Sequence, residues 1–230
     1  MYRKFYHQTI KRNIAVFATL FDGIHIDLAN NKEVRVPIHY APKEKFIEVA
    51  TRRPDIHNVI VDVQLPVMGF ELISLNFAPE RATNKLQRIT ANAVKPDGTR
   101  DYMYNRVPYD LQFELYVATT RLEDGHKIVE QILPFFAPEL TVAIKAVEGM
   151  VEDSNVTVVL TSVSPSIEYE SGMSDKRVIL WQLSFTVKTH LYSDIKSQRV
   201  IDTAILELGT DENLDYYFAE ITDRFVVTQP

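Results

Sequence analysis

The sequence predicts one α+β domain, in which helices flank a mixed and mostly antiparallel β-sheet. Segments whose apolar residues alternate, as strands require, are interspersed with segments whose apolar residues recur at helical spacing. No internal repeat or low-complexity tract divides the 230 residues, and a chain of this length can bury a substantial core without disulfides or metals. We expect this domain to span residues 1–192.

The first element expected is an amphipathic helix. Apolar residues over 10–21 lie three and four positions apart, and Gly23 is placed to end the helix. The apolar face carries Ile10, Ile14, Phe17 and Phe21. The solvent side carries Lys11, Arg12 and Asn13.

A hairpin and a short helix are expected next. Apolar residues alternate over 24–28 and again over 34–40, with Asn30 and Asn31 suited to the turn between them. Pro42 suits the first turn of a helix. Further strands are expected over residues 59–65 and 70–77.

The sequence predicts a long loop or extended arm over residues 78–106. The segment is polar and shows no stable period, and loops of this length inside a compact domain tend to be functional. Six Lys and Arg stand against three Asp and Glu, so we expect an arm that contacts an acidic protein surface. No aromatic stacking ladder favours nucleic acid. The alternative is an excursion with no partner.

Two strictly alternating segments, residues 109–118 and 177–191, predict half-buried strands whose other face is solvated. Between them, Glu123 and Asp124 favour a helix N-terminus, and Pro134 must kink or end that helix. The expected core cluster is Leu111, Phe113, Leu115, Ile128, Val129, Ile132, Leu133, Trp181 and Phe185. Other expected elements are a strand over residues 156–162 and a helix over residues 201–208.

No residue constellation supports an enzyme. The chain has no cysteine, which excludes disulfides, thiolate metal sites and a cysteine nucleophile, and it lacks the common phosphate-loop, nucleophile-elbow and zinc-helix motifs. His25 and Asp27 share one strand face, but two ligands are a weak metal signal. We therefore expect no catalytic residues, no metal and no cofactor.

The charge is spread unevenly along the chain. Residues 1–60 carry ten Lys and Arg against six Asp and Glu, whereas residues 193–230 carry three against eight. We expect the acidic segment 193–230 to be helical and to pack on the domain or on a neighbour. Such asymmetry can orient a contact between subunits, although two solvated surfaces would look the same. The net charge of −6 argues against a general nucleic-acid binder, and no apolar run is long enough to span a membrane.

Several segments, in this order along the chain, resemble the tail sheath stabiliser and completion proteins of T-even-type contractile-tailed phages. The segment EDGHKIVEQILPFFAPEL contains IVEQILP, a stretch whose proline ends a helix. The resemblance does not cover residues 66–106 or those after residue 192. The segments that carry it are residues 5–26, 35–46, 108–121, 123–140 and 181–187.

The resemblance implies a tail-terminator-like α+β fold and a non-enzymatic virion structural protein, assembled in the host cytoplasm. It implies a homohexameric ring at the head-proximal end of the tail, which caps tube and sheath, stabilises the extended sheath and joins the tail to the neck. The implied partners are the chain itself, the tail sheath protein, the tail tube or tail terminator protein, and neck or connector proteins, with no membrane and no specific nucleic acid.

Three alternatives stay open: a tail terminator or head–tail connector ring, the same fold in a headless contractile particle, and a metal-dependent hydrolase. If the chain forms a ring of subunits, we expect contacts from the aromatic and basic N-terminus and from the arm. We also expect contacts from the two phenylalanine side chains that Pro134 turns toward a surface or a neighbour. The alternatives are that the N-terminal aromatics form a first strand and that the two rings cap the core. The candidate contact residues are Tyr2, Arg3, Phe5, Tyr6, Lys11, Arg12, Arg81, Lys85, Arg88, Lys95, Arg100, Phe135 and Phe136.

Overall fold

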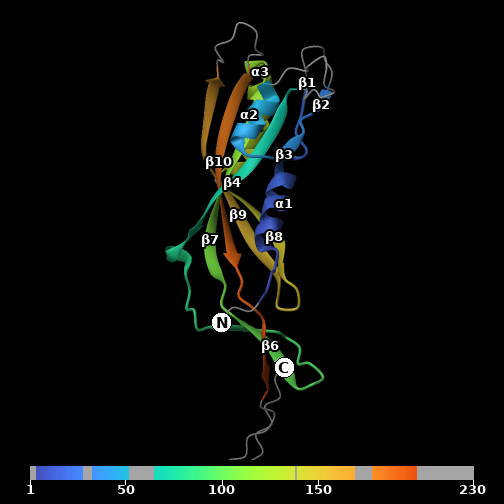
Figure 1. Cartoon of the computed structure of the whole chain (residues 1–230), viewed down its shortest axis with the longest axis vertical. Coiled ribbons are helices and arrows are strands. Elements are labelled where there is room, and N and C mark those ends of the chain that lie inside the picture. Colours follow the sequence, from blue (N-terminus) through green and yellow to red (C-terminus); the bar gives the residue numbers. More distant parts are fainter. Residues whose placement is uncertain (1–3, 28–32, 52–64, 138, 169–177, 201–230) are drawn as a thin grey trace, which may run out of the picture.

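The structure is a computed structural model, and it confirms the α+β class. The described residues are 4–27, 33–51, 65–137, 139–168 and 178–200. A long sheet forms the body, and a small sheet projects from one end (Figure 1). The helices are α1 (Thr9–Phe21), α2 (Lys43–Thr51) and α3 (Leu122–Ile132), with 3-10 turns η1 (Pro79–Arg81) and η2 (Leu133–Phe136). No helix in the described part has the length and apolarity to cross a membrane.

The body is a six-stranded sheet in the order β3-β4-β7-β10-β9-β8. Only its edge pair, β3 with β4, is parallel; the other four pairings are antiparallel. The strands are β3 (Ile38–Tyr40), β4 (Val67–Phe77), β7 (Val107–Thr119), β10 (Val178–Leu191), β9 (Val151–Glu168) and β8 (Glu139–Val147). The predicted hairpin is confirmed as β1 (His25–Asp27) paired with β2 (Glu33–Arg35).

The centre of the sheet is the pair β7 and β10. Residues 107–119 oppose residues 179–191 one for one, without a bulge. Opposite residues share a face of the sheet, so the alternating apolar residues of both strands meet on one side. Phe113 opposes Phe185 and Val117 opposes Trp181, and these side chains are buried.

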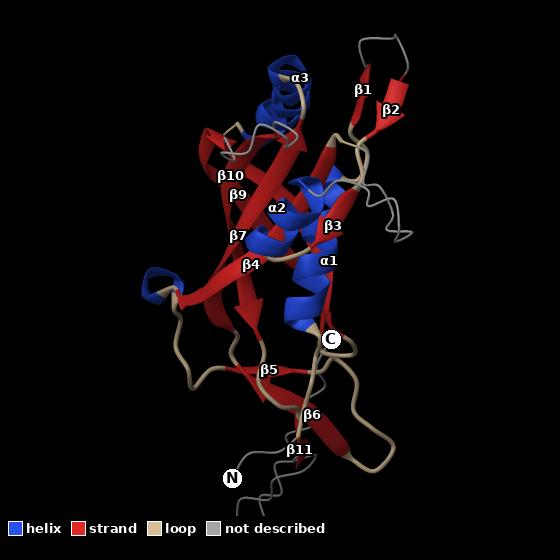
Figure 2. Cartoon of the chain, turned by 45° about the horizontal axis from the view of Figure 1, so that its top comes forward, coloured by secondary structure: helices blue, strands red, loops and turns tan. Residues whose placement is uncertain are grey.

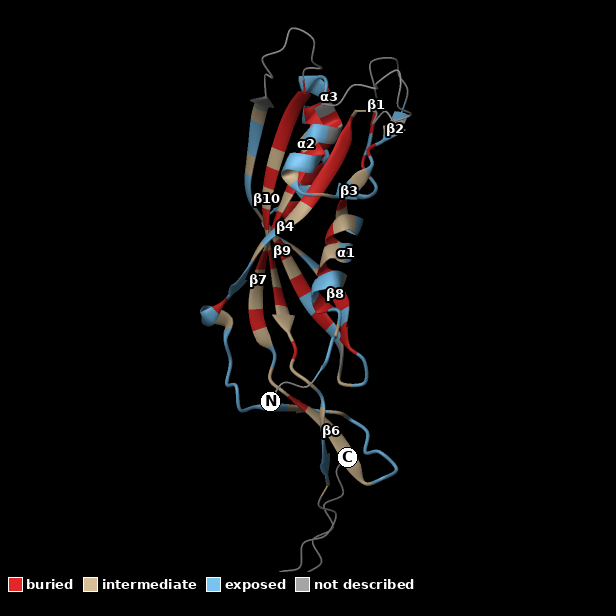
Figure 3. Cartoon of the chain, in the orientation of Figure 1, coloured by how far each residue is buried: buried red, intermediate tan, exposed pale blue. Residues whose placement is uncertain are grey.

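That face forms the main core together with α1, α3 and η2 (Figure 3). Eight of the nine predicted core residues belong to this one cluster. The ninth, Leu133, is exposed, so its predicted burial is wrong. The reason is that α3 ends at Ile132 and the following 3-10 turn, which contains Pro134, presents Leu133 on its outer side.

The buried face of α1 is rotated from the one that the apolar pattern predicts. Its buried residues are Thr9, Asn13, Phe17 and Phe21. Asn13, expected on the solvent side, is 1% exposed, whereas Ile10 is exposed. The Asn13 amide nitrogen donates to the carbonyl oxygen of Thr9 at 2.9 Å and to the hydroxyl of Thr189 at 3.2 Å. These hydrogen bonds allow a polar side chain to occupy the core.

The opposite face of the sheet is also covered at one end. Phe46 and Ala50 of α2 pack on Tyr116, Ala118 and Leu180, so this part of β7 is buried on both faces. The expectation that the other face of the strand over residues 109–118 is solvated is therefore wrong at Tyr116, which is fully buried.

The hydroxyl of Tyr116 is held between two carboxylates. It is within hydrogen-bonding distance of the carboxylates of Glu71, at 2.7 Å, and Glu114, which oppose each other across β4 and β7, and it shares its one proton between them. Burial, then these two acceptors, raises the pKa of Tyr116 and keeps the hydroxyl a donor.

Some of the predicted short elements are confirmed and others are wrong. The short helix after Pro42 is confirmed as α2, but the single strand expected over 34–40 is wrong, because the chain breaks at Pro37 into β2 and β3. β8 was not predicted. Residues 59–64 of the strand expected over 59–65, and the helix expected over 201–208, lie outside the described residues.

The arm is a small sheet rather than a loop. Residues 88–90 form β5 (Arg88–Thr90), residues 99–104 form β6 (Thr99–Tyr104), and both join β11 (Lys196–Arg199) in the order β11-β6-β5 (Figure 2). The prediction of a loop is wrong for these strands. The segment projects from the body (Figure 1), and β11 completes its sheet. The helix expected for residues 193–230 is therefore wrong over residues 196–199, and residues 201–230 lie outside the described residues.

We expect Phe113→Ala to lower the free energy of unfolding by about 3–5 kcal/mol, because it empties a fully buried site. Urea denaturation monitored by circular dichroism measures this change. Phe135→Ala is the matched control: its ring is 68% exposed, so the midpoint should hardly move. Equal shifts for the two variants would contradict the assignment of the core.

Candidate assembly interface

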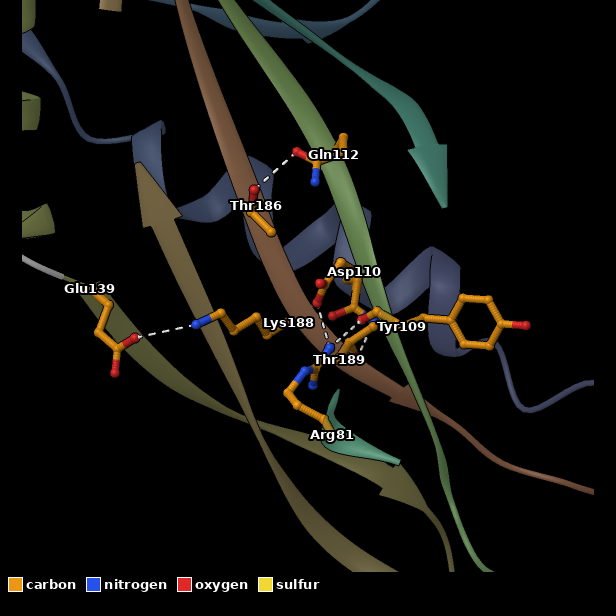
Figure 4. Close-up of polar contacts among 9 residues, drawn as sticks. Arg81, Tyr109, Asp110, Gln112, Glu139, Thr186, Lys188 and Thr189 are labelled. Atoms are coloured by element: carbon orange, nitrogen blue, oxygen red, sulfur yellow. Dashed lines mark hydrogen bonds and ion pairs between the residues drawn. The ribbon is translucent and has the colours of Figure 1, made fainter. Parts of the chain in front are cut away.

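The arm is anchored to the main sheet by Arg81 on η1. The guanidinium forms an ion pair with Asp110 and donates a hydrogen bond to the carbonyl oxygen of Tyr109 at 3.1 Å, both on β7 (Figure 4). Both charged side chains are three-quarters buried, so solvent screens this pair less than a surface pair. Arg81, predicted as a contact residue, is thus engaged within its own subunit.

The sheet face beside this anchor is polar. Gln112 accepts a hydrogen bond from the hydroxyl of Thr186 at 3.0 Å, and the ammonium of Lys188 lies 4.0 Å from the carboxylate of Glu139 (Figure 4). Gln112 and Thr186 are directly opposed on neighbouring strands, where the ladder fixes their spacing, whereas Lys188 on β10 reaches across β9 to Glu139 on β8. This polar face and the anchor form a rigid base for the arm.

His190 on β10 lies at the same base. Burial lowers the pKa of His190 to about 4, and the positive charges of Arg106 and Arg81 act in the same direction. Its Nδ1 atom is buried without a hydrogen-bond partner in the described structure. The imidazole is therefore neutral at physiological pH, between two arginines that would repel its charged form.

One face of the small sheet packs on the body. Met103 of β6 is fully buried against Ala146, Val147 and Tyr192, with Ile89 of β5 at the edge of the same cluster. These contacts involve the end of β8 and the residue after β10, so the arm has an apolar attachment as well as a polar one.

The N-terminal segment meets the arm at Ser193. The carbonyl oxygen of Ser193 lies 2.8 Å from Nε2 of His7, and its hydroxyl accepts a hydrogen bond from the backbone N–H of Tyr104 at 3.2 Å. Phe5 and Tyr6 are exposed and form no strand. Two groups of candidate residues that are far apart in sequence therefore gather at one end of the molecule.

The basic residues at the start of α1 have different roles. Arg12 donates to the carbonyl oxygens of Lys145, at 3.0 Å, and Ala146, so it fixes the end of β8. Lys11 is exposed beside it. Tyr2 and Arg3, which were also predicted as contact residues, lie outside the described residues.

The remaining basic residues of the arm divide between its loops and its sheet. Lys85 is exposed on the segment before β5, and Lys95 pairs with Asp101 at 2.8 Å. Arg88 and Arg100 lie on strands, on the side of the small sheet opposite Met103.

The two rings after Pro134 point in opposite directions. Phe136 is 7% exposed and contacts the rings of Phe21 and Phe185, so the prediction that it faces a surface or a neighbour is wrong. Phe135 is exposed, as predicted. It lies in η2, directly after α3 on the body.

Sequence reasoning missed an exposed apolar edge on β4. Its partner β3 pairs only with residues 68–70, and no described strand covers that side of residues 71–77. Ile73, Leu75 and Phe77 are exposed along this stretch. Strand edges with exposed apolar side chains are sites where another chain can pair. Alternation of apolar residues predicted the strand, but it could not show that one edge lacks a neighbour.

Within the described residues, no group of three or more His, Asp or Glu side chains is placed to hold a metal ion. His25 and Asp27, the weak candidates from sequence, both lie in the exposed hairpin and are separately engaged. His25 interacts through Nδ1 with the carbonyl oxygen of Gly23 at 2.9 Å, and the carbonyl oxygen of Asp27 accepts from Lys127.

Comparison with known proteins gives two findings. Residues 4–229 match the model of a family described as the T4-like virus Myoviridae tail sheath stabiliser. The chain is also similar to the tail completion protein gp15 of Enterobacteria phage T4, at 27% identity over 205 residues, which covers 85% of this chain and 74% of that protein.

We expect His190→Gln to weaken the pH dependence of stability. The folded pKa of about 4 lies below the ordinary value of 6.5, so between these values the unfolded chain binds a proton that the native chain does not. The free energy of unfolding therefore falls as the pH drops from about 6.5 towards 4. Urea denaturation at pH 7 and pH 5 should show a smaller loss in His190→Gln than in the wild type and in an exposed control, His39→Gln. Identical losses in all three proteins would contradict the assignment.

Proposed function

Because this chain belongs to the tail sheath stabiliser family of T4-like myoviruses, we propose that it forms a homohexameric ring at the head-proximal end of the contractile tail. The membership itself establishes a structural protein of the phage tail, and hence of the virion. In the proposed ring, the chain caps tube and sheath, holds the sheath extended and presents a surface to the neck.

The projecting arm is the observation that carries this proposal. A small sheet that is anchored by Arg81 and packed through Met103 is rigid enough to present side chains at a distance from the body. The N-terminal segment, held through His7 and Ser193, adds exposed Phe5 and Tyr6 to the same end. Aromatic residues and arginine are enriched in interfaces, and this composition supports a contact with sheath or a neighbouring subunit.

A closed ring needs two different surfaces on each subunit, because the contact is heterologous. We assign the apolar edge of β4 to one side of this contact. Its exposed backbone groups and its side chains Leu75 and Phe77 suit pairing with an extended segment of the next subunit. A tail terminator or a head–tail connector ring would use the same surfaces, so the position in the virion separates these roles.

Electron microscopy of the purified chain, alone and with extended sheath, tests the ring. We expect sixfold rings that cap the sheath at one end. A protein that stays monomeric at all concentrations and does not bind sheath would overturn the proposal.

Leu75→Glu tests the β4 edge. We expect assembly to weaken by roughly tenfold or more, equivalent to about 1.4 kcal/mol, because a charge would be buried in the contact. Leu122→Glu is the matched control, since Leu122 is 45% exposed, close to the 42% of Leu75, but lies on α3. Sedimentation velocity across concentrations measures both variants. Equal weakening by the two would remove the β4 edge from the contact.

A further inference from the structure

The outer face of the arm carries cations and aromatic rings but no carboxylate. Directly opposed residues share a face, so the pairings across the small sheet define its members. The outer face consists of Arg88, Thr90, Arg100, Tyr102, Tyr104, Lys196 and Gln198. These seven residues are called the basic–aromatic face here.

The cations of this face lie over its own rings. The Arg88 guanidinium is 4.7 Å from the ring centroid of Tyr102, and the Lys196 ammonium is 4.7 Å from that of Tyr104. Arg88 also donates to the side chain of Gln198 at 3.0 Å, across β6. The cations are therefore held in defined positions.

Carboxylate partners for these cations are missing in the described part of the chain. Arg88, Arg100 and Lys196 form no ion pair there, and the buried Nε atom of Arg100 has no hydrogen-bond partner. On the inner face, by contrast, Asp101 pairs with Lys95 and accepts a hydrogen bond from Ser197 at 2.6 Å. The outer face therefore holds three cations and no carboxylate, whereas the inner face holds the carboxylate of Asp101 as well as the cation Arg199.

We propose that the acidic C-terminal segment, residues 211–223, docks on the basic–aromatic face of its own subunit. This segment, DENLDYYFAEITD, contains five carboxylates, three adjacent aromatic residues and no Lys or Arg. Its charge and its aromatic content both complement the face. The proposal goes beyond the assembly function and does not depend on it, because it concerns a contact inside one subunit.

The connection along the chain favours the subunit's own segment over that of another copy. β11 belongs to the small sheet, and the backbone N–H of Val200 donates to the carbonyl oxygen of Gly98 at 3.2 Å, so the chain leaves from the edge of this face. A tether of about ten residues gives a local concentration in the millimolar range, above that of free subunits in solution.

Nucleic acid suits the face less well. Bases bind single-strand sites by stacking on open aromatic rings, but Tyr102 and Tyr104 are each approached by a cation of the same face. The chain as a whole carries a net charge of −6, which repels a polyanion. Carboxylates do not need an open ring on which to stack, because they can bind the N–H groups of the cations that point away from the rings.

Disulfide trapping tests the contact, because the natural chain has no cysteine. The test pair is Thr90→Cys, on the face, with Asn213→Cys, in the full-length chain. The control pair is Ala93→Cys with Asn213→Cys; Ala93 is exposed in the β5–β6 loop, nearly the same number of residues from Asn213. We expect the test pair to close an intramolecular disulfide roughly tenfold faster than the control pair, because loop-closure entropy barely differs between them.

Charge is tested by adding Arg88→Gln and Lys196→Gln to the test pair. We expect these changes, or high salt, to slow disulfide closure to the rate of the control pair.

Equal closure rates for the unmodified test pair and the control pair would overturn the proposal. Disulfide-linked dimers whose yield grows with concentration would overturn it in favour of a second copy, and displacement of the segment by single-stranded DNA would favour nucleic acid. If Thr90→Cys fails to fold, judged by circular dichroism, Gln198→Cys supplies a second position on the same face, with Ser197→Cys, the preceding residue on the opposite face, as its control.

Discussion

The one-for-one pairing of β7 with β10 is the constraint on which the rest of this structure depends. Thirteen opposed positions bring the apolar residues of both strands to one face, where α1, α3 and η2 pack. A slip by one residue would exchange the two faces and place Phe113 and Phe185 in solvent. The register is therefore fixed by burial, and every other element is placed relative to it.

The length of this strand pair explains why the arm lies at one end. α2 covers the second face of the sheet near Tyr116 and Leu180, whereas near Asp110 and Lys188 that face carries polar pairs. The anchor residue Arg81 thus finds its carboxylate partner where the sheet is open to polar groups. A charged anchor would be costly under α2, where the surroundings are apolar. The end of the sheet under α2 is thus packed on both faces, whereas the opposite end has one polar face, and the arm is attached there.

The sequence predicted the elements whose signal is local. Alternation identified β7 and β10, helical spacing identified α1, the acidic pair and Pro134 bounded α3, and most of the core followed from those signals. Asn13 was misplaced because its burial depends on Thr189, which is 176 residues away. The short strands β5 and β6 contain too few residues to show a period, and they are stabilised by β11 from the other end of the chain. β8 alternates through Leu140, Val142 and Ile144, so its signal was present.

The candidate contact residues show the same division. Sequence identified which cations lie in the N-terminal segment and in the arm, but not which of them have partners inside the subunit. Arg12 binds carbonyl oxygens of β8, and Arg81 binds a carboxylate of β7, so both side chains are engaged in contacts within the subunit. Arg88 and Lys196 instead lie over tyrosine rings on an outer face.

This division among the cations has consequences for assembly. Exposed cations outside the basic–aromatic face, such as Lys11 and Lys85, act mainly on the rate and orientation of approach, and salt weakens their effect. Apolar groups such as Leu75 and Phe77 on the β4 edge lose water on contact, and this contribution is far less sensitive to salt. A ring built from both kinds of surface would therefore assemble more slowly as salt rises while its finished contacts dissociate at nearly the same rate. Stopped-flow association and dilution-induced dissociation separate these two rates, and a salt-dependent dissociation rate would mean that charges dominate the finished contact.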